Sequence, residues 1–413
     1  MIMENKLSIY DFVKTVSDVI DLTSPLVSSH HKRVANIACN IAQRMNLPND
    51  EIQDIVLASM LHDIGAFSIN ERICARVFES FDGDSCQHAL IGYRLLKCFE
   101  PLEKAAELVK HHHTNYSTHG NSIPIGSHII HLADRSVILF EDDSEILAQI
   151  PNMLETIFHK HTMFHPDALE VLMCLAGLEN VWIETFSQSH DEAILNKIEF
   201  AKEVTCLETL RSFARFIARI IDFRSRFTAT HSSGVAAVAM ELSTVFGFSE
   251  MECKQMEIAG FLHDLGKLAI PGEVLEKKGA LSNDEFSIIK KHAYYTYAIL
   301  SKLNGMEQIA VWAAHHHERQ DGNGYPFHVH GRDSPMLARI MAVSDIMTAL
   351  SEDRPYRPGM NRADVLSIIF SMAKNGGLDM NIAELADKNF HRINTVRIKA
   401  QEDARKEYEF FHT

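Results

Sequence analysis

The chain has 413 residues, of which 46% are hydrophobic and 23% charged, a composition that excludes a mostly disordered or collagen-like protein. The net charge of −15 argues against a protein that grips a DNA or RNA polymer through a basic face. The absence of a long apolar run and of a signal-peptide pattern predicts a cytoplasmic protein without membrane contact.

Histidine is unusually frequent: 24 histidines outnumber the 19 glycines. Histidine is the commonest metal ligand in proteins, so this excess needs an explanation at the level of a site. The seven cysteines include no CxxC pair, which indicates reduced core residues rather than a disulfide framework or a zinc-thiolate site.

In the first half, a helical spacing of apolar residues follows His31 and leads to LASMLHDIGAFSI (57–69). KHHHTNY (110–116) and the helical stretch MFHPDALEVLMCLAGL come next. The polar segment SQSHDEAILNK (187–197) is the best candidate boundary, so the first domain is expected to span residues 1–195.

The second expected domain, residues 196–413, opens with a linker helix over 207–223 and then repeats the first. Ser249 and Glu252 have the spacing of a capping box, which predicts a helix that runs into IAGFLHDLGKLAI (258–270). AHHHERQ (314–320) matches KHHHTNY. Five polar residues of the first half recur in the second half in the same order and with the same residue types. They are His31, His62, His88, His113 and Asp134, which correspond to His231, His263, His292, His317 and Asp345. Helical spacing dominates both copies, so we predict an all-α fold.

The polar residues of the second copy favour metal chemistry. Imidazoles and carboxylates suit iron, manganese or zinc. The second copy offers five imidazoles and two carboxylates, which are too many ligands for one such ion. Two ions about 3.5–4 Å apart can share a carboxylate bridge, hold a hydroxide and clamp both oxygens of an in-line displacement at phosphorus. Phosphoester hydrolysis is therefore the reaction class that these residues predict.

The order H…HD…H…H…D resembles the HD superfamily of metal-dependent phosphohydrolases, and HDLGK followed by HHERQDGNGYP (316–326) resembles its HD-GYP subfamily. The resemblance covers about residues 225–405. It implies tandem HD-type helical domains and a phosphodiesterase that converts cyclic di-GMP, 3′3′-cyclic GMP-AMP or both to a linear dinucleotide, through a hydroxide activated by two metal ions. Iron or manganese are the implied metals. The implied ligands are His231, His263, Asp264, His292, His316, His317 and Asp345, with Asp264 as the bridge and His315 as the spare histidine.

The resemblance also implies substrate contacts. Lys267 would neutralise a phosphate oxygen in the transition state, and Arg354 and Arg357 in SEDRPYRPG (351–359) would meet the second phosphate or a guanine edge. Tyr325 could line the groove, face a protein partner or pack internally. Glu318 is expected to orient a neighbouring histidine.

Two positions depart from the pattern of relatives. Phe227 stands where some relatives carry a glutamate for a third metal, which implies a two-metal site. Thr348 stands where many have an aspartate, so a contact to the site should be weakened or replaced.

The first half keeps an equivalent set but resembles a general HD domain, because Ala66 occupies the lysine position and no DGxGYP follows. Three interpretations remain open for it: a second hydrolase with a different substrate such as a nucleotide monoester, a regulatory domain that binds ligand or metal, and a structural relic. Its candidate metal site comprises His31, His62, Asp63, His88, His112, His113 and Asp134.

Two other functions remain open for the whole chain. One is a non-catalytic effector that binds a cyclic dinucleotide and contacts a protein partner through the GYP surface. The other is an HD hydrolase of a different phosphorylated nucleotide. A homodimer is also compatible with the sequence.

Overall fold

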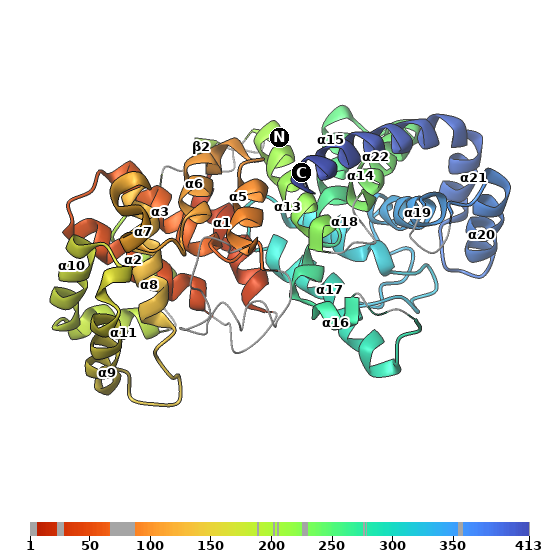
Figure 1. Cartoon of the computed structure of the whole chain (residues 1–413). Coiled ribbons are helices and arrows are strands. Elements are labelled where there is room, and N and C mark those ends of the chain that lie inside the picture. Colours follow the sequence, from red (N-terminus) through yellow and green to blue (C-terminus); the bar gives the residue numbers. More distant parts are fainter. Residues whose placement is uncertain are drawn as a thin grey trace. The chain divides into compact units, whose positions relative to one another are not determined.

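The protein is all-α, as the sequence predicts (Figure 1). The computed structural model describes residues 6–22, 29–66, 87–187, 190–200, 203–204, 206–224, 230–275, 277, 279–353 and 358–412. Its only described sheet pairs two strands of two residues each, β1 (Lys6–Leu7) and β2 (Glu203–Val204), antiparallel. Contacts divide the chain into two compact units, residues 8–202 and residues 203–413 together with residues 1–7.

The first unit, residues 8–202, is built from short helices. They are α1 (Ile9–Asp21), α2 (His30–Arg44), α3 (Asn49–Leu61), α5 (Gln87–Leu96), α6 (Glu103–Lys110), α7 (Tyr116–His119), α8 (Ile125–Val137), α9 (Ile146–His159), α10 (Pro166–Ala176), α11 (Glu179–Phe186) and α12 (His190–Leu195), with 3-10 turns η1 (Glu100–Leu102), η2 (Gly120–Ser122) and η3 (His161–Met163). Helix α2 packs against α3 and α8, and most residues of α2 and α8 are buried.

The second unit repeats this plan with longer helices. They are α13 (Leu207–Arg224), α14 (His231–Phe246), α15 (Glu250–Leu262), α16 (Gly272–Leu275), α17 (Asn283–Leu300), α18 (Glu307–Ala314), α19 (Met336–Ser351), α20 (Arg362–Lys374), α21 (Met380–Lys388) and α22 (Phe390–His412), with 3-10 turns η4 (Leu265–Ala269) and η5 (His315–His317). Helix α14 packs against α15, α19 and α22, so it stands in this unit where α2 stands in the first.

The polar segment expected to link the domains is tied to the first unit. The Gln43 amide donates to the carbonyl of Lys197 at 3.0 Å, and the Gln53 amide donates to the carbonyl of Glu199 at 2.7 Å. The Lys197 ammonium also donates to Glu184 at 2.8 Å. These contacts explain why the division by contacts falls after residue 202.

Local sequence signals fix several helix starts. At α15, the Ser249 hydroxyl accepts from the backbone N–H of Glu252, and the Glu252 carboxylate accepts from the backbone N–H of Ser249, which confirms the predicted capping box. Ser282 and Glu285 form the same arrangement at the start of α17. Helix α13 confirms the helix expected over residues 207–223.

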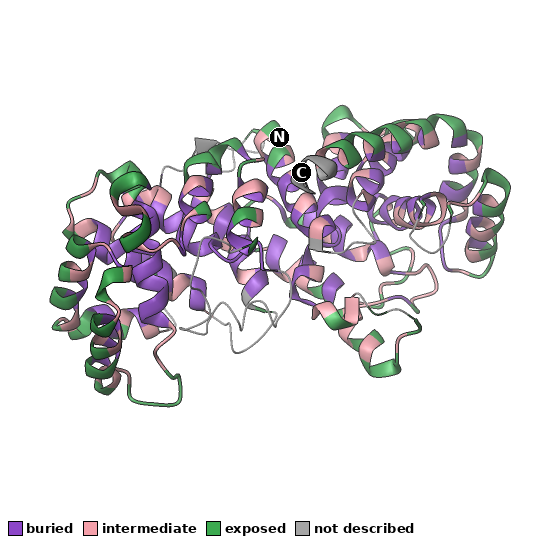
Figure 2. Ribbon diagram, viewed as in Figure 1, coloured by how far each residue is buried: buried purple, intermediate pink, exposed green. Residues whose placement is uncertain are grey.

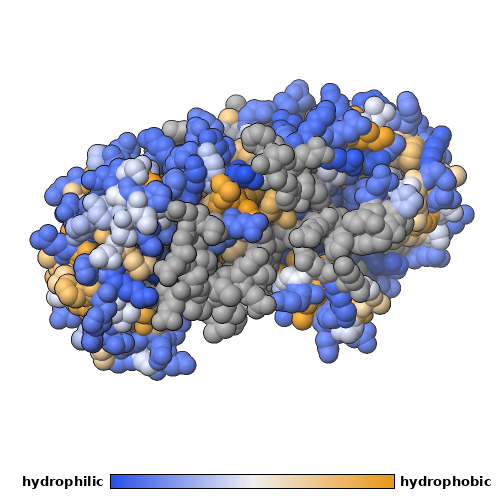
Figure 3. Space-filling model, viewed as in Figure 1, coloured by the Kyte–Doolittle hydropathy of each residue, from blue (hydrophilic) through white to orange (hydrophobic). Residues whose placement is uncertain are grey.

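Burial follows the amphipathic pattern within each unit. Figure 2 shows buried residues along α14 and α19 and exposed residues along the outer sides of α20, α21 and α22. The face shown in Figure 3 is mainly hydrophilic where residues are coloured, and its hydrophobic residues form small scattered groups. Within the described residues, no helix combines the length and apolar composition that a bilayer crossing requires.

One glycine in each unit allows the turn after the His-Asp pair to touch a neighbouring helix. A Cβ at Gly65 would lie 2.1 Å from the carbonyl oxygen of His88, and a Cβ at Gly266 would lie 2.0 Å from that of His292. Both distances are far below any van der Waals contact. The absence of a side chain therefore lets η4 approach α17 closely enough to bring Asp264 and His292 together.

We expect Gly266→Ala to destabilise the second unit by about 2–3 kcal/mol, because the new methyl group must push apart two backbones. Thermal unfolding followed by circular dichroism should show the unit's transition lowered by about 5–10 °C. Gly272→Ala is the matched control, since a Cβ there meets nothing within 4 Å. An equal melting temperature for both variants would contradict the packing argument.

Candidate metal centre

The candidate ligands of the second unit come from five separate elements that converge in its core. His231 begins α14, His263 and Asp264 lie between α15 and η4, and His292 lies within α17. His316 and His317 lie in η5, and Asp345 lies on α19. These residues form the C-terminal cluster: His231, His263, Asp264, His292, His316, His317 and Asp345.

The Asp264 carboxylate lies at the centre of the C-terminal cluster. Its Oδ1 atom lies 3.5 Å from Nε2 of His292 and 3.8 Å from Nε2 of His316. Its Oδ2 atom lies 3.2 Å from Nε2 of His263. One oxygen therefore faces each of two histidine groups, which is the arrangement of a carboxylate that can bridge two ions.

Two groups of ligand atoms are preassembled around this carboxylate. His231, His263 and Asp264 present ligand atoms within 4.8 Å of one another, and so do His292, His316 and His317. His231 Nε2 also lies 3.1 Å from Asp345 Oδ1, which connects α14 to α19. The structure thus brings together the ligand set that the sequence resemblance implies.

Backbone carbonyls orient three of the histidines. The Nδ1 atoms of His263, His292 and His316 donate to the carbonyls of Gly260, Ile289 and Ala313, each three residues earlier, at 2.8, 2.6 and 2.7 Å. A carbonyl oxygen can only accept, so Nδ1 carries the proton and Nε2 keeps its lone pair. The inward Nε2 atoms are therefore ready to coordinate a metal.

Burial sets the charge state of these side chains. It lowers the pKa of His292 to about 3 and that of His317 to about 4, so both are neutral near pH 7. Burial opposes ionisation of Asp264 as well, but the neighbouring His263 and the Lys267 ammonium hold the pKa of its carboxyl well below the usual range. Neutral imidazoles and an ionised carboxylate are the ligand forms that a divalent ion needs.

His231 differs from the other ligands. Burial lowers its pKa, but Glu352 and Asp345 outweigh burial and raise it to about 10. Metal binding at His231 would therefore release a proton near neutral pH.

The predicted substrate residues are only partly described. The Lys267 ammonium lies 2.5 Å from Oδ2 of Asp264, and its side chain is 23% exposed, so it can reach both the cluster and solvent. The Tyr325 ring lies 4.7 Å from the His317 ring, measured between centroids. Arg354, Arg357 and Phe227 lie outside the described residues.

Glu352 is a site residue that the sequence argument missed. Its Oε2 atom lies 3.1 Å from Nδ1 of His231 and accepts from the Gln401 amide at 3.1 Å. Among the described residues, the Thr348 hydroxyl has no hydrogen-bond partner. The carboxylate that contacts His231 is therefore that of Glu352, four residues after Thr348. The sequence signal that could have identified Glu352 was its position within SEDRPYRPG.

Glu318 lies beside His315, and its charge acts against the effect of burial on the pKa of that histidine. Its carboxylate also accepts from the backbone N–H groups of Phe327 and Val329, at 2.7 and 3.0 Å. Glu318 therefore fixes the chain after the DGNGYP turn, since it ties two backbone donors beyond that turn to the end of η5.

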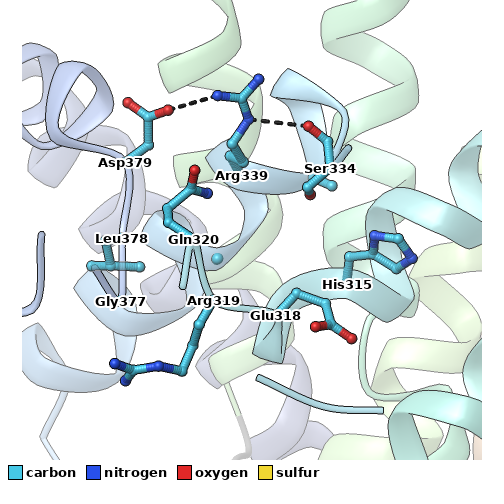
Figure 4. Close-up of a pocket in the computed structure, with 11 residues that line it drawn as sticks. His315, Glu318, Arg319, Gln320, Ser334, Arg339, Gly377, Leu378 and Asp379 are labelled. Atoms are coloured by element: carbon cyan, nitrogen blue, oxygen red, sulfur yellow. Dashed lines mark hydrogen bonds and ion pairs between the residues drawn. The ribbon is translucent and has the colours of Figure 1, made fainter. Parts of the chain in front are cut away.

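The spare histidine, His315, lines a small cavity beside η5, with Glu318 nearby (Figure 4). Arg339 crosses the cavity wall between Asp379, at 2.8 Å, and the carbonyl of Ser334, at 3.1 Å (Figure 4). The cavity measures about 10 Å³, which is room for about one water molecule. A dinucleotide cannot enter there.

The first unit holds a parallel assembly, the N-terminal cluster: His30, His62, Asp63, His88, His112, His113 and Asp134. Asp63 Oδ1 lies 3.4 Å from Nε2 of His88 and 3.8 Å from Nε2 of His112, and Asp63 Oδ2 lies 3.5 Å from Nε2 of His62. Nδ1 of His62 and Nδ1 of His112 again donate to carbonyls three residues earlier, those of Ser59 and Val109. The geometry around Asp63 therefore repeats that around Asp264.

Position 30 supplies a residue that the sequence argument missed. His30 Nε2 lies 3.1 Å from Asp134 Oδ1, and His30 groups with His62 and Asp134 as possible metal ligands. His31, the residue predicted there, is buried with its ring 5.2 Å from that of His62. The two adjacent histidines could not be distinguished by spacing alone.

Arg135 gives the N-terminal cluster a charge that the C-terminal cluster lacks at the equivalent position. This arginine is 2% exposed, and its Nε and Nη2 atoms donate to Asp134 Oδ2 at 3.0 and 2.7 Å. The corresponding residue after Asp345 is Ile346. One oxygen of the Asp134 carboxylate is thus committed to a fixed cation, and Ala66 replaces Lys267.

The donors of both clusters fit divalent metal ions. Four ligand atoms are buried and have no hydrogen-bond partner among the described residues: Asp264 Oδ1, Asp63 Oδ1, His62 Nε2 and His112 Nε2. Buried polar atoms are normally satisfied, and these point into groups of imidazole and carboxylate ligands. Bound ions would satisfy them.

Comparisons with known proteins agree with this duplication. HD domain models match residues 27–137 and residues 215–382. The 3′3′-cGAMP-specific phosphodiesterase 1 of Vibrio cholerae is 29% identical over 87% of this chain and 87% of its own length. A cyclic di-GMP phosphodiesterase response regulator of Xanthomonas campestris is 38% identical over 38% of this chain and 42% of its own.

A solved structure shows the same fold. The crystal structure described as a cyclic GMP-AMP-specific phosphodiesterase of V. cholerae aligns with a TM-score of 0.64 at 20% identity, covering 94% of this chain and 98% of that one. The two matched models together span most of the chain, one in each compact unit. The chain belongs to the HD domain family and carries two HD domains.

Proposed function

We propose that this protein is a metal-dependent phosphodiesterase that hydrolyses cyclic di-GMP, 3′3′-cyclic GMP-AMP or both to a linear dinucleotide at the C-terminal cluster. The observation that carries the proposal is the Asp264 carboxylate, which presents one oxygen to each of two histidine groups. The names of the V. cholerae and X. campestris relatives support the substrate class.

The C-terminal cluster would hold two divalent ions, with iron or manganese as the proposed metals because imidazole and carboxylate ligands suit both. His231, His263 and Asp345 would serve one ion, His292, His316 and His317 the other, and Asp264 both. Ions held in this way supply an activated water and positive charge for the phosphate.

The chain's own residues complete the reaction. In the hydrolysis, a water oxygen bonds to phosphorus, the bond to the 3′ oxygen breaks, and that oxygen takes a proton. Lys267 is cationic because Asp264 outweighs burial and raises its pKa, so its ammonium can stabilise charge that builds on a phosphate oxygen. Tyr325, with a pKa raised chiefly by burial, remains a neutral phenol beside His317. Arg354 and Arg357 remain proposed contacts to the substrate.

A non-catalytic effector is the main competing function. Intact ligands and a lysine at the centre of the cluster favour catalysis, because ligand sensing requires neither. The DGNGYP turn favours a cyclic dinucleotide over other phosphorylated nucleotides as the substrate.

Purified protein loaded with iron or manganese should convert cyclic di-GMP or cyclic GMP-AMP to a linear product that chromatography resolves. Asp264→Ala should abolish this conversion, since it removes the ligand common to both histidine groups. Failure of the wild type with both nucleotides and both metals would contradict the enzymatic proposal. Unchanged turnover in Asp264→Ala would contradict the proposed site.

Lys267→Ala, which copies the natural Ala66 of the first unit, should lower kcat by about 100-fold or more through loss of transition-state stabilisation. Metal content, measured by plasma mass spectrometry, should stay at the wild-type value because Lys267 is not a ligand. Lys302→Ala, at an exposed lysine of the same unit, is the control. A kcat within twofold of the wild type for Lys267→Ala would rule out the proposed role.

We propose that the N-terminal cluster binds metal without hydrolysing a cyclic dinucleotide. The ligand geometry around Asp63 supports metal binding. Ala66 removes the phosphate-facing cation, and Arg135 occupies an oxygen of Asp134, so the residues that support catalysis in the second unit are missing. A regulatory role fits this combination better than a second hydrolase or a relic does.

Metal analysis of two variants can separate the clusters. The wild type should hold about two ions per cluster, Asp63→Ala should lose those of the first unit, and Asp264→Ala those of the second. Only Asp264→Ala should abolish formation of the linear product. Loss of product in Asp63→Ala with full activity in Asp264→Ala would reverse the assignment.

A further inference from the structure

An aromatic and cationic surface adjoins the C-terminal cluster. Phe286 and Lys290 lie one turn apart on α17, and Tyr325 lies in the DGNGYP turn. The Phe286 ring meets the Tyr325 ring edge-on, with centroids 6.2 Å apart, and the Lys290 ammonium lies 4.8 Å from the Phe286 centroid and 5.6 Å from the Tyr325 centroid. We call these three residues the α17 wall.

The wall is physically continuous with the metal ligands. The Tyr325 ring is tilted by 37° against the ring of His317, and the Tyr325 backbone N–H donates to the His317 carbonyl at 3.2 Å. His292, another ligand, lies on the same helix as Phe286 and Lys290. A molecule whose phosphate sits at the cluster therefore has the wall within reach.

Phe286 is a large exposed aromatic residue close to the C-terminal cluster. Its side chain is 44% exposed, although it belongs to a helix that buries His292, Ala293 and Thr296. A large exposed aromatic beside a buried polar cluster is typical of a binding surface, since every nucleobase offers a face for stacking.

The Lys290 ammonium lies beside aromatic rings, and no described carboxylate pairs with it. The acidic residue nearest to Lys290 along α17 is Glu285. Its carboxylate pairs with the Lys277 ammonium at 2.5 Å instead. Within the described part of the chain, Lys290 contacts the rings of Phe286 and Tyr325 and forms no ion pair with a carboxylate. In a protein of net charge −15, such a lysine suits an anionic ligand.

We propose that the α17 wall is a nucleotide subsite, where Phe286 stacks a purine base of the substrate and Lys290 meets the adjoining phosphate. This inference rests on the proposed function. An aromatic face and a point charge read neither the Watson–Crick nor the Hoogsteen edge, so the subsite adds affinity for guanine and adenine nucleotides alike.

Equilibrium binding can test the subsite independently of turnover. The probe is the bisphosphorothioate analogue of cyclic di-GMP, which resists hydrolysis, titrated into the metal-loaded full-length protein by calorimetry. Phe286→Ala should raise Kd by about tenfold, a value within the range for loss of one base–aromatic stack. Phe286→Trp should bind within twofold of the wild type, because it keeps the stacking face.

Lys290→Met keeps the apolar stem and removes the charge, so it should weaken binding severalfold at low salt and less at high salt. Tyr294→Ala is the matched control: Tyr294 is 51% exposed on the same helix and contacts Tyr295 and Phe327 rather than Tyr325. It should leave Kd unchanged. Metal content equal to that of the wild type should accompany every variant.

An unchanged Kd in Phe286→Ala, or no binding of the analogue by the wild type, would overturn the subsite. Loss of metal in Phe286→Ala together with loss of binding would also overturn it, because the residue would then act through the fold. Turnover of cyclic di-GMP by the wild type is measured separately, so failure of the subsite and failure of the proposed function give different results.

Discussion

The sharing of one buried carboxylate between two sets of imidazoles is the constraint on which the second unit depends. Asp264 is 2% exposed, and its two oxygens face His292 and His263 on opposite sides. A buried carboxylate among neutral rings is costly unless cations compensate it. Lys267 supplies part of that charge, and bound ions would supply the rest. The close approach of η4 to α17 at Gly266 places this carboxylate beside His292.

The same constraint explains how the helices present their histidines. His263, His292 and His316 each donate from Nδ1 to the carbonyl three residues earlier, so the helix backbone itself selects the tautomer. Glu352 does the corresponding work for His231, from a different part of the chain. Orientation of the ligands is therefore mostly local, whereas their convergence requires the packing of α14, α15, α17 and α19.

Duplication of this plan has allowed the two units to diverge in charge while the ligand geometry persists. In the first unit, Asp63 occupies the place of Asp264, but Ala66 and Arg135 replace Lys267 and Ile346. The second unit has a partly exposed lysine paired with Asp264, whereas the first unit has a buried guanidinium fixed on Asp134. The Lys267 side chain keeps some contact with solvent, whereas Arg135 is almost wholly buried.

The sequence by itself determined the all-α class, the internal repeat and the His and Asp residues that are the candidate ligands, because helical periodicity and the ordered anchors are properties of spacing. It could not choose between His30 and His31, place Glu352 beside His231, or foresee that Glu318 binds the backbone of Phe327 and Val329. Those contacts join residues whose directions depend on how whole helices and turns pack. Only the tertiary structure decided them, because spacing along a chain fixes which face a residue occupies but not which distant group that face will meet.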